Sequence, residues 1–130
     1  MKAMRLHAPA SLTTLRLDNG WSVPDPGPGE IRVRLRAASL NFRDGLVVNG
    51  FFPARDGLVP LSDGAGEVVA LGEGVRDFAL GDRVVSTFHP NWIDGHIEKS
   101  SLDNSPGGPA DGFACEETTR PHTGKVCIAI

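Results

Sequence analysis

The sequence predicts a single, mainly β domain with one or two short helices, and three observations lead to this fold class. Its 130 residues suffice for one domain with a hydrophobic core. The 16 glycines and 10 prolines are typical of a domain with many turns. Apolar residues alternate with polar ones over short stretches, whereas the long periodicity of amphipathic helices is missing.

The first two strands are expected at Met1–His7 and Leu12–Leu17, separated by Ala8-Pro9-Ala10. Pro24–Gly29 predicts a rigid turn, because each proline fixes φ and the glycines can take positive φ. The clearest strand of the chain follows at Glu30–Ala37.

This strand has an apolar face for the core and a second face that carries three arginines. Three guanidinium groups in a row could bind a phosphate, but a solvent-exposed sheet face is the favoured interpretation. The alternating residues are Ile31, Val33, Leu35 and Ala37 on one side and Arg32, Arg34 and Arg36 on the other.

A short helix is expected after Asn41. Asparagine is a favourable N-cap, and Asp44, three residues later, is a shorter version of the capping-box acid. The apolar residues 46–48 follow, and Gly50 suits the left-handed position after a helix. The helix would have about two turns.

The segment Leu61–Val75 combines a glycine-rich start with the apolar run Val68–Leu71. The start resembles a dinucleotide-binding fingerprint, but Val69 stands at the third glycine position. Strand-forming residues also follow Gly66, where the fingerprint requires a helix. A glycine turn that begins a buried strand is therefore predicted.

The rest of the chain is predicted as turn, strand, loop and strand. Phe78–Ser86 indicates a Gly-Asp turn that leads into a strand, and a long surface loop is expected from His89 to about Gly112. Gly124–Ile130 returns to a strand. Its residues Val126, Ile128 and Ile130 are expected to pack against Ile31, Val33 and Leu35.

Composition excludes several classes of function. The net charge is −3 and the basic residues are dispersed, which argues against nucleic acid as a partner. No apolar run is as long as a membrane span, and the N-terminus lacks the regions of a signal peptide. Cys115 and Cys127 do not amount to a disulfide framework. We therefore expect a cytoplasmic protein with reduced thiols and no membrane partner.

Several motifs occur in the same order and spacing in the medium-chain dehydrogenase/reductase superfamily. Over Met1 to about Thr87 the chain resembles the N-terminal catalytic domain of that superfamily, a GroES-like, partly open β barrel. His89–Gly95 and Gly107–Gly112 resemble the loop that follows in one zinc-independent branch. The motifs are Gly29-Glu30 before the alternating strand, Asn41-Phe42-Arg43-Asp44, Pro60 to Val69, and Val75 through Gly81-Asp82-Arg83-Val84.

The resemblance implies a substrate cleft. In it Asn41 and Asp44 would be the catalytic residues, near the nicotinamide and the substrate. The alternative that these two residues merely cap the helix stays open, and the two roles are compatible. The other cleft residues that the resemblance implies are Phe42, Arg43, Ser62 and Asp63.

The residues at the metal positions argue against zinc. Zinc-dependent members carry a cysteine where this chain has Asn41 and a Gly-His-Glu where it has Leu61-Ser62-Asp63. Neither Asn nor Ser replaces a thiolate or an imidazole as a zinc ligand. The structural-zinc lobe of the family needs four cysteines close together. His7, His89, His96 and His122 also lack ligand spacing, so no metal is expected.

In the superfamily a Rossmann coenzyme domain for NAD or NADP(H) follows the barrel. Here His122–Ile130 resembles the last strand of the family and comes directly after Gly112–Pro121. The resemblance thus implies that the coenzyme domain has been excised. Residues 1–130 would form one GroES-like catalytic domain, with 1–112 as its N-terminal part and 122–130 as the returning C-terminal strand.

Two functions are compatible with this interpretation. The first is the catalytic domain of a zinc-independent, NAD(P)H-dependent oxidoreductase for quinones or similar small carbonyl compounds. It would not turn over alone, because no loop for the coenzyme pyrophosphate is present. The second is a non-catalytic GroES-like module for binding or oligomerisation, or an engineered minimal domain. Excision would bare the cleft side around Phe42, Phe51 and Phe52, where self-association is expected.

Overall fold

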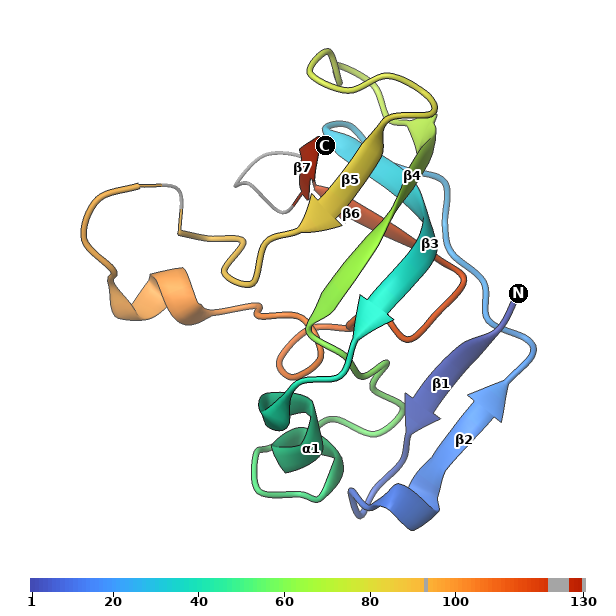
Figure 1. The fold of residues 1–130 in the computed structure, drawn as a ribbon, viewed down its shortest axis with the longest axis vertical. Helices are drawn as coiled ribbons and strands as arrows, with labels where there is room; N and C mark the ends of the chain where they lie inside the picture. Colours follow the sequence, from blue (N-terminus) through green and yellow to red (C-terminus); the bar gives the residue numbers. More distant parts are fainter. Residues whose placement is uncertain (93, 122–126, 130) are drawn as a thin grey trace.

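The computed structural model describes residues 1–92, 94–121 and 127–129. A two-stranded antiparallel sheet pairs β1 (Ala3–Leu6) with β2 (Leu15–Asp18), and a larger sheet forms the rest of the body (Figure 1). Helix α1 (Phe42–Val48) lies beyond the end of the larger sheet, beside the small one. The mainly β fold is confirmed.

The larger sheet has five strands in the order β6-β3-β4-β5-β7, and every neighbouring pair is antiparallel. The long strands β3 and β4 form its centre. The bounds are β3 (Glu30–Ser39), β4 (Asp63–Leu71), β5 (Arg83–Ser86), β6 (Glu117–Pro121) and β7 (Cys127–Ala129).

Two hydrophobic clusters hold these parts together. Ile31 and Val33 on β3 pack with residues of β4 and β5, and Leu35 packs against them, so these three residues of the predicted apolar face enter the core. Ala37 is exposed instead, beyond the register shift between Leu35 and Ala37. A second cluster joins β1, α1 and the segment before β4. Burial of each such side chain is worth about 1.5–3 kcal/mol. The first cluster consists of Ile31, Val33, Val68 and Val84. The second consists of Leu6, Val47, Val48 and Leu58.

The arginines on the other face of β3 are neutralised within the chain. Each contacts a carboxylate from a different element, with N···O distances of 2.9–3.0 Å. This supports the solvent-exposed sheet face over the phosphate site. The pairs are Arg32–Asp25, Arg34–Glu117 and Arg36–Glu67.

The strand predicted at Leu12–Leu17 begins later than expected, because its first three residues form a 3-10 turn, η1 (Leu12–Thr14). The Ser11 hydroxyl accepts from the backbone N–H of Thr13 at 3.2 Å. The Ser11 N–H donates to the Thr14 hydroxyl at 3.1 Å. Local bonds of this kind compete with strand pairing.

The glycine turn predicted before Val68 is wrong, because Gly64 and Gly66 lie inside β4. A Cβ at Gly66 would overlap the carbonyl oxygen of Arg34 on the neighbouring strand, and one at Gly64 would overlap the ring of Phe113. Glycine is needed here for close approach within a strand.

The C-terminal third contains one strand that was not predicted, β6. The loop from His89 to about Gly112 is present and includes a second 3-10 turn, η2 (Lys99–Leu102). β7 lies within the strand predicted at Gly124–Ile130 and pairs with β5. The expected packing of the Val126, Ile128 and Ile130 side chains falls outside what the structure describes.

Helix α1 begins where Asn41 predicts it. It has seven residues, and no helix in the described part of the chain is long and apolar enough to cross a bilayer.

Candidate functional site

Four of the predicted site residues meet where β3 ends, α1 begins and β4 starts, namely Asn41, Asp44, Ser62 and Asp63. Asn41 occupies the N-cap position of α1 with extended backbone. Its backbone N–H donates to Asp44 Oδ2 at 2.8 Å, which is the capping-box contact expected from the sequence. The side chain of Asn41, by contrast, makes no capping bond to the helix.

Asp44 joins the helix to the segment before β4. Its Oδ1 accepts the backbone N–H of Ser62 at 3.0 Å, while its Oδ2 holds Asn41. Both Asp44 and Ser62 are buried, with 4% and 2% of their surface exposed. Both carboxylate oxygens therefore serve the placement of the residues around them.

The Asn41 side chain is the centre of a small polar cluster. Its Nδ2 donates to Asp63 Oδ2 at 2.7 Å and lies 3.1 Å from Ser39 Oγ and 3.4 Å from Ser62 Oγ. Ser39 Oγ also lies 3.4 Å from Asp63 Oδ2. Asn41 and Ser39 are exposed, so the cluster faces solvent and can orient a polar ligand by hydrogen bonds. Ser39 was not expected here, because the predicted strand ended at Ala37.

The chemistry of these donors does not suit zinc. One carboxylate, one amide and two hydroxyls provide neither a thiolate nor an imidazole. Within the ranges that the structure describes, no group of three or more His, Cys, Asp or Glu side chains could hold a metal. His7 instead contacts Asp56 at 3.1 Å, and His89 lies edge-on to Phe88. His122 is outside the described residues.

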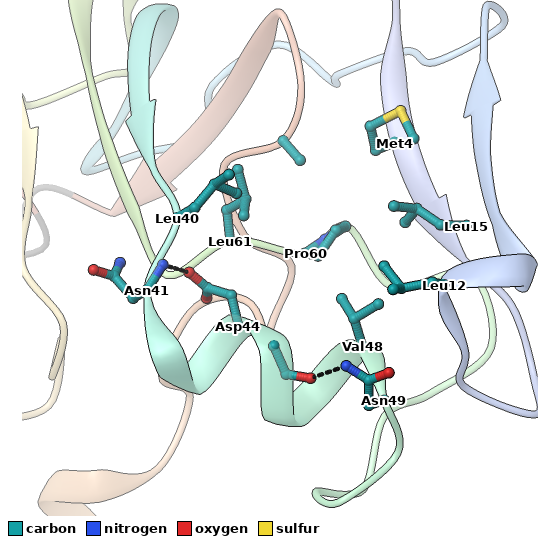
Figure 2. Close-up of a pocket in the computed structure, with 12 residues that line it drawn as sticks. Met4, Leu12, Leu15, Leu40, Asn41, Asp44, Val48, Asn49, Pro60 and Leu61 are labelled. Carbon is teal, nitrogen blue, oxygen red and sulfur yellow. Dashed lines mark hydrogen bonds between the residues drawn. The ribbon is translucent and has the colours of Figure 1, made fainter.

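A cavity of about 350 Å³ lies between α1, the β1–β2 hairpin and the segment at Leu61. Figure 2 shows the residues that line it. Asn41 and Asp44 lie at one end of it, and most of the remaining wall is apolar. The lining residues include Met4, Leu12, Leu15, Leu40, Val48 and Pro60.

Phe42 and Arg43 stand apart from the cluster, and no hydrogen bond within the described residues joins them to it. Phe42 is 85% exposed. The Arg43 guanidinium lies 4.9 Å from the centre of the Phe88 ring and donates to the carbonyl oxygen of Pro106 at 3.2 Å. Arg43 also lines a second cavity of about 350 Å³. No sequence pattern indicated Phe88 and Pro106 as its partners, because both come from irregular segments.

Comparisons with known proteins show the family to which this chain belongs. Residues 27–129 match the profile of the alcohol dehydrogenase GroES-like domain. A zinc-type alcohol dehydrogenase-like protein of Schizosaccharomyces pombe is 44% identical over 95 residues, which are 71% of this chain and 28% of that protein. The chloroplastic quinone-oxidoreductase QR1 of Triphysaria versicolor is 43% identical over 68 residues, 49% of this chain and 21% of that protein.

The fold of this chain is also similar to that of solved alcohol dehydrogenases. A thermostable alcohol dehydrogenase from Pyrobaculum aerophilum superposes with a TM-score of 0.81 at 28% identity, over 99% of this chain and 40% of that one. This chain thus spans well under half the length of these relatives. It belongs to the alcohol dehydrogenase GroES-like domain family and is a catalytic domain of the medium-chain dehydrogenase/reductase superfamily.

Proposed function

We propose that this chain is the substrate-side domain of a zinc-independent, NAD(P)H-dependent reductase of quinones or similar small carbonyl compounds, and that it does not turn over alone. The observation that carries the proposal is the cluster centred on Asn41. By the resemblance drawn from the sequence, Asn41 and Ser62 stand where zinc-dependent members carry metal ligands, and the cluster is built from an amide, two hydroxyls and one carboxylate.

The role proposed for the cluster is to bind and orient the substrate. Asn41 is held by Asp63, and Asp44 fixes the backbone on both sides of the cluster. The two N–H groups of the Asn41 amide are directed at Asp63 and at the Ser39 hydroxyl. The exposed Ser39 hydroxyl, held in this way, is then the donor that can direct a hydrogen bond at a substrate oxygen without reorganising. Asp44 is then a positioning residue, since neighbouring backbone N–H groups use both of its oxygens.

The nicotinamide coenzyme would supply the hydride, but the described residues do not fit its pyrophosphate. They contain no strand–glycine loop–helix unit of the kind that holds one. The only G-x-G of β4 packs against Phe113 and the backbone of β3, so its amides do not line an open loop. Coenzyme binding in the parent enzyme is therefore assigned to another domain.

Metal content tests the first half of the proposal. Untagged protein purified without chelator should contain far less than one zinc per chain by mass spectrometry. A variant with Asn41→Cys and Ser62→His, which places a thiolate and an imidazole beside Asp63, should gain zinc if it keeps the fold. One zinc per wild-type chain, retained through dialysis, would refute zinc independence. The S. pombe relative is named a zinc-type protein, so the zinc content of this chain has to be measured directly.

Coenzyme binding tests the second half. NADPH should bind this chain no better than millimolar, a free energy of roughly 4 kcal/mol, and should not be oxidised with quinones above background. Micromolar, saturable binding or turnover that Asn41→Ala abolishes would contradict the proposal.

The exposed phenylalanines favour a second candidate function, a non-catalytic module for binding or self-association. Phe42 and Phe51 are 85% and 75% exposed. If NMR titrations show no binding of any quinone and the chain associates through these residues, the non-catalytic module is the better description.

A further inference from the structure

Arg43 differs from the arginines of β3 in its partners. Those arginines contact carboxylates, whereas no ion pair within the described residues includes Arg43. Its contacts are one backbone carbonyl, Pro106 O, and the face of the Phe88 ring. The residue is partly buried, and a guanidinium offers five N–H donors, so its charge and most of its donors are available to a ligand.

The cavity beside Arg43 is apolar apart from this charge. Its volume is about 350 Å³, and Val47, Phe52, Pro53 and Pro109 line it together with Gly108. A cavity of roughly 150 Å³ holds benzene, so this one has room for a body of about two fused rings. It is separate from the cavity of Figure 2, and the two share no lining residue.

The Arg43 side chain is held in place by its surroundings. Phe88 lies against the guanidinium, Pro106 accepts from it, and Gly108 leaves room for it. A Cβ at Gly108 would stand 2.5 Å from Arg43 Nη2. The absence of a side chain at position 108 is thus what allows the cation to reach the cavity wall.

We propose that this cavity binds a compact aromatic or branched apolar molecule that carries a carboxylate, with Arg43 as the partner of the carboxylate. A planar guanidinium pairs with a carboxylate through two parallel hydrogen bonds, and this pairing is strongest away from bulk water. The statement that such an acid is the substrate of the parent enzyme rests on the proposed function, whereas the binding site does not. The substrate class would then be a carbonyl compound that is also a carboxylic acid.

The test uses 2-naphthoate and its neutral analogue 2-naphthamide, titrated into the whole chain and followed by ¹⁵N NMR. Wild-type protein should bind naphthoate at least tenfold more tightly than naphthamide, with shifts at Arg43 and Gly108. Arg43→Gln should abolish the difference between the two ligands. Arg36→Gln removes an exposed arginine that is paired with Glu67 and should leave the difference unchanged.

Gly108→Ala provides a second variant that keeps the charge but displaces it. It should weaken naphthoate at least fivefold and leave naphthamide within twofold, because only the flexible end of Arg43 has to move. Equal binding of both ligands by the wild type, or an undiminished preference in Arg43→Gln, would overturn the site. Neither probe is reduced and no coenzyme is present, so the result is independent of the zinc and NADPH measurements.

Discussion

Asp44 shows how one side chain can organise a site without contacting a ligand. Its two oxygens accept the N–H groups of Asn41 and Ser62, one at the start of α1 and one before β4. Because Asp44 and Ser62 are 4% and 2% exposed, the Ser62 N–H has no water as an alternative acceptor. The distance between these two backbone segments therefore depends on this residue.

Replacing Asp44 by asparagine should lower the free energy of unfolding by about 2 kcal/mol, because one acceptor becomes an N–H₂ group that faces a donor. Urea denaturation of Asp44→Asn and of the exposed control Asp94→Asn measures the difference. A loss of stability that is equal in both variants would contradict the structural role of Asp44.

The thiol of Cys115 gives a prediction in pH. Burial raises its pKa from 9.0 to about 11, against the opposing effect of the nearby Arg120. The folded state thus favours the neutral thiol, and this contribution to stability is complete below pH 9 and lost as the pH rises to about 11. In a Cys127→Ser background, native Cys115 should react with iodoacetamide far more slowly at pH 9 than unfolded protein does. Equal rates would refute the shift.

The sequence was informative about Asn41 and Asp44 as residues of a helix start, because capping is a local interaction. It could not show that the Asn41 amide turns away from the helix toward Asp63. That contact requires β3 and β4 to be paired in one register, with Ser39 opposite Asp63. Nor could it show that Arg43 meets no carboxylate among the described residues, since its neighbours come from distant loops.

At the scale of elements, strands with an apolar face were predictable and β6 was not. Glu117–Pro121 contains charged residues, threonines and a proline, with no apolar alternation. It becomes a strand because β3 offers it a hydrogen-bonding edge and Arg34 offers Glu117 an ion pair. Conversely, the glycines of β4 suggested a turn. The sequence around them does not show that the backbone of β3 and the ring of Phe113 approach so closely that only glycine fits.

Replacing either of two glycines by alanine should change the stability of the protein, in opposite directions. Gly45 lies in the middle of α1, and a Cβ at this position would have no other atom within 4 Å. Gly45→Ala should therefore stabilise the protein by about 0.5–1 kcal/mol. Gly66→Ala should destabilise it, because the methyl group would overlap the Arg34 carbonyl and force β3 and β4 apart. Thermal unfolding of the two variants measures both effects. A stable Gly66→Ala protein would show that the sheet can yield there.

At the scale of the whole molecule, large aromatic side chains are exposed at the helical end. Phe42, Phe51 and Phe52 are 85%, 75% and 46% exposed. An apolar surface of this kind is typical of an interface. The self-association expected from the sequence stays a prediction, and the excision of a coenzyme domain likewise.

Sedimentation velocity over a hundredfold range of concentration tests the association. We expect reversible dimers or larger species, which the double variant Phe42→Ser, Phe51→Ser should convert to monomer. Leu80→Ser removes a side chain that is 66% exposed in the turn before β5, at the opposite end in Figure 1, and should change nothing. A monomeric wild type would refute the association.

The order of strands in the larger sheet also has a consequence for synthesis. β3 leaves the ribosome before β6, whose Glu117 lies 83 residues after its partner Arg34. At about 5–20 residues per second, translation leaves this edge of β3 open for on the order of ten seconds. During that time the backbone N–H and C=O groups along this edge of β3 lack their partners, and an open strand edge of this kind invites aggregation. Synonymous codons that slow translation between β3 and β6 should therefore lower the yield of soluble protein without changing a single residue.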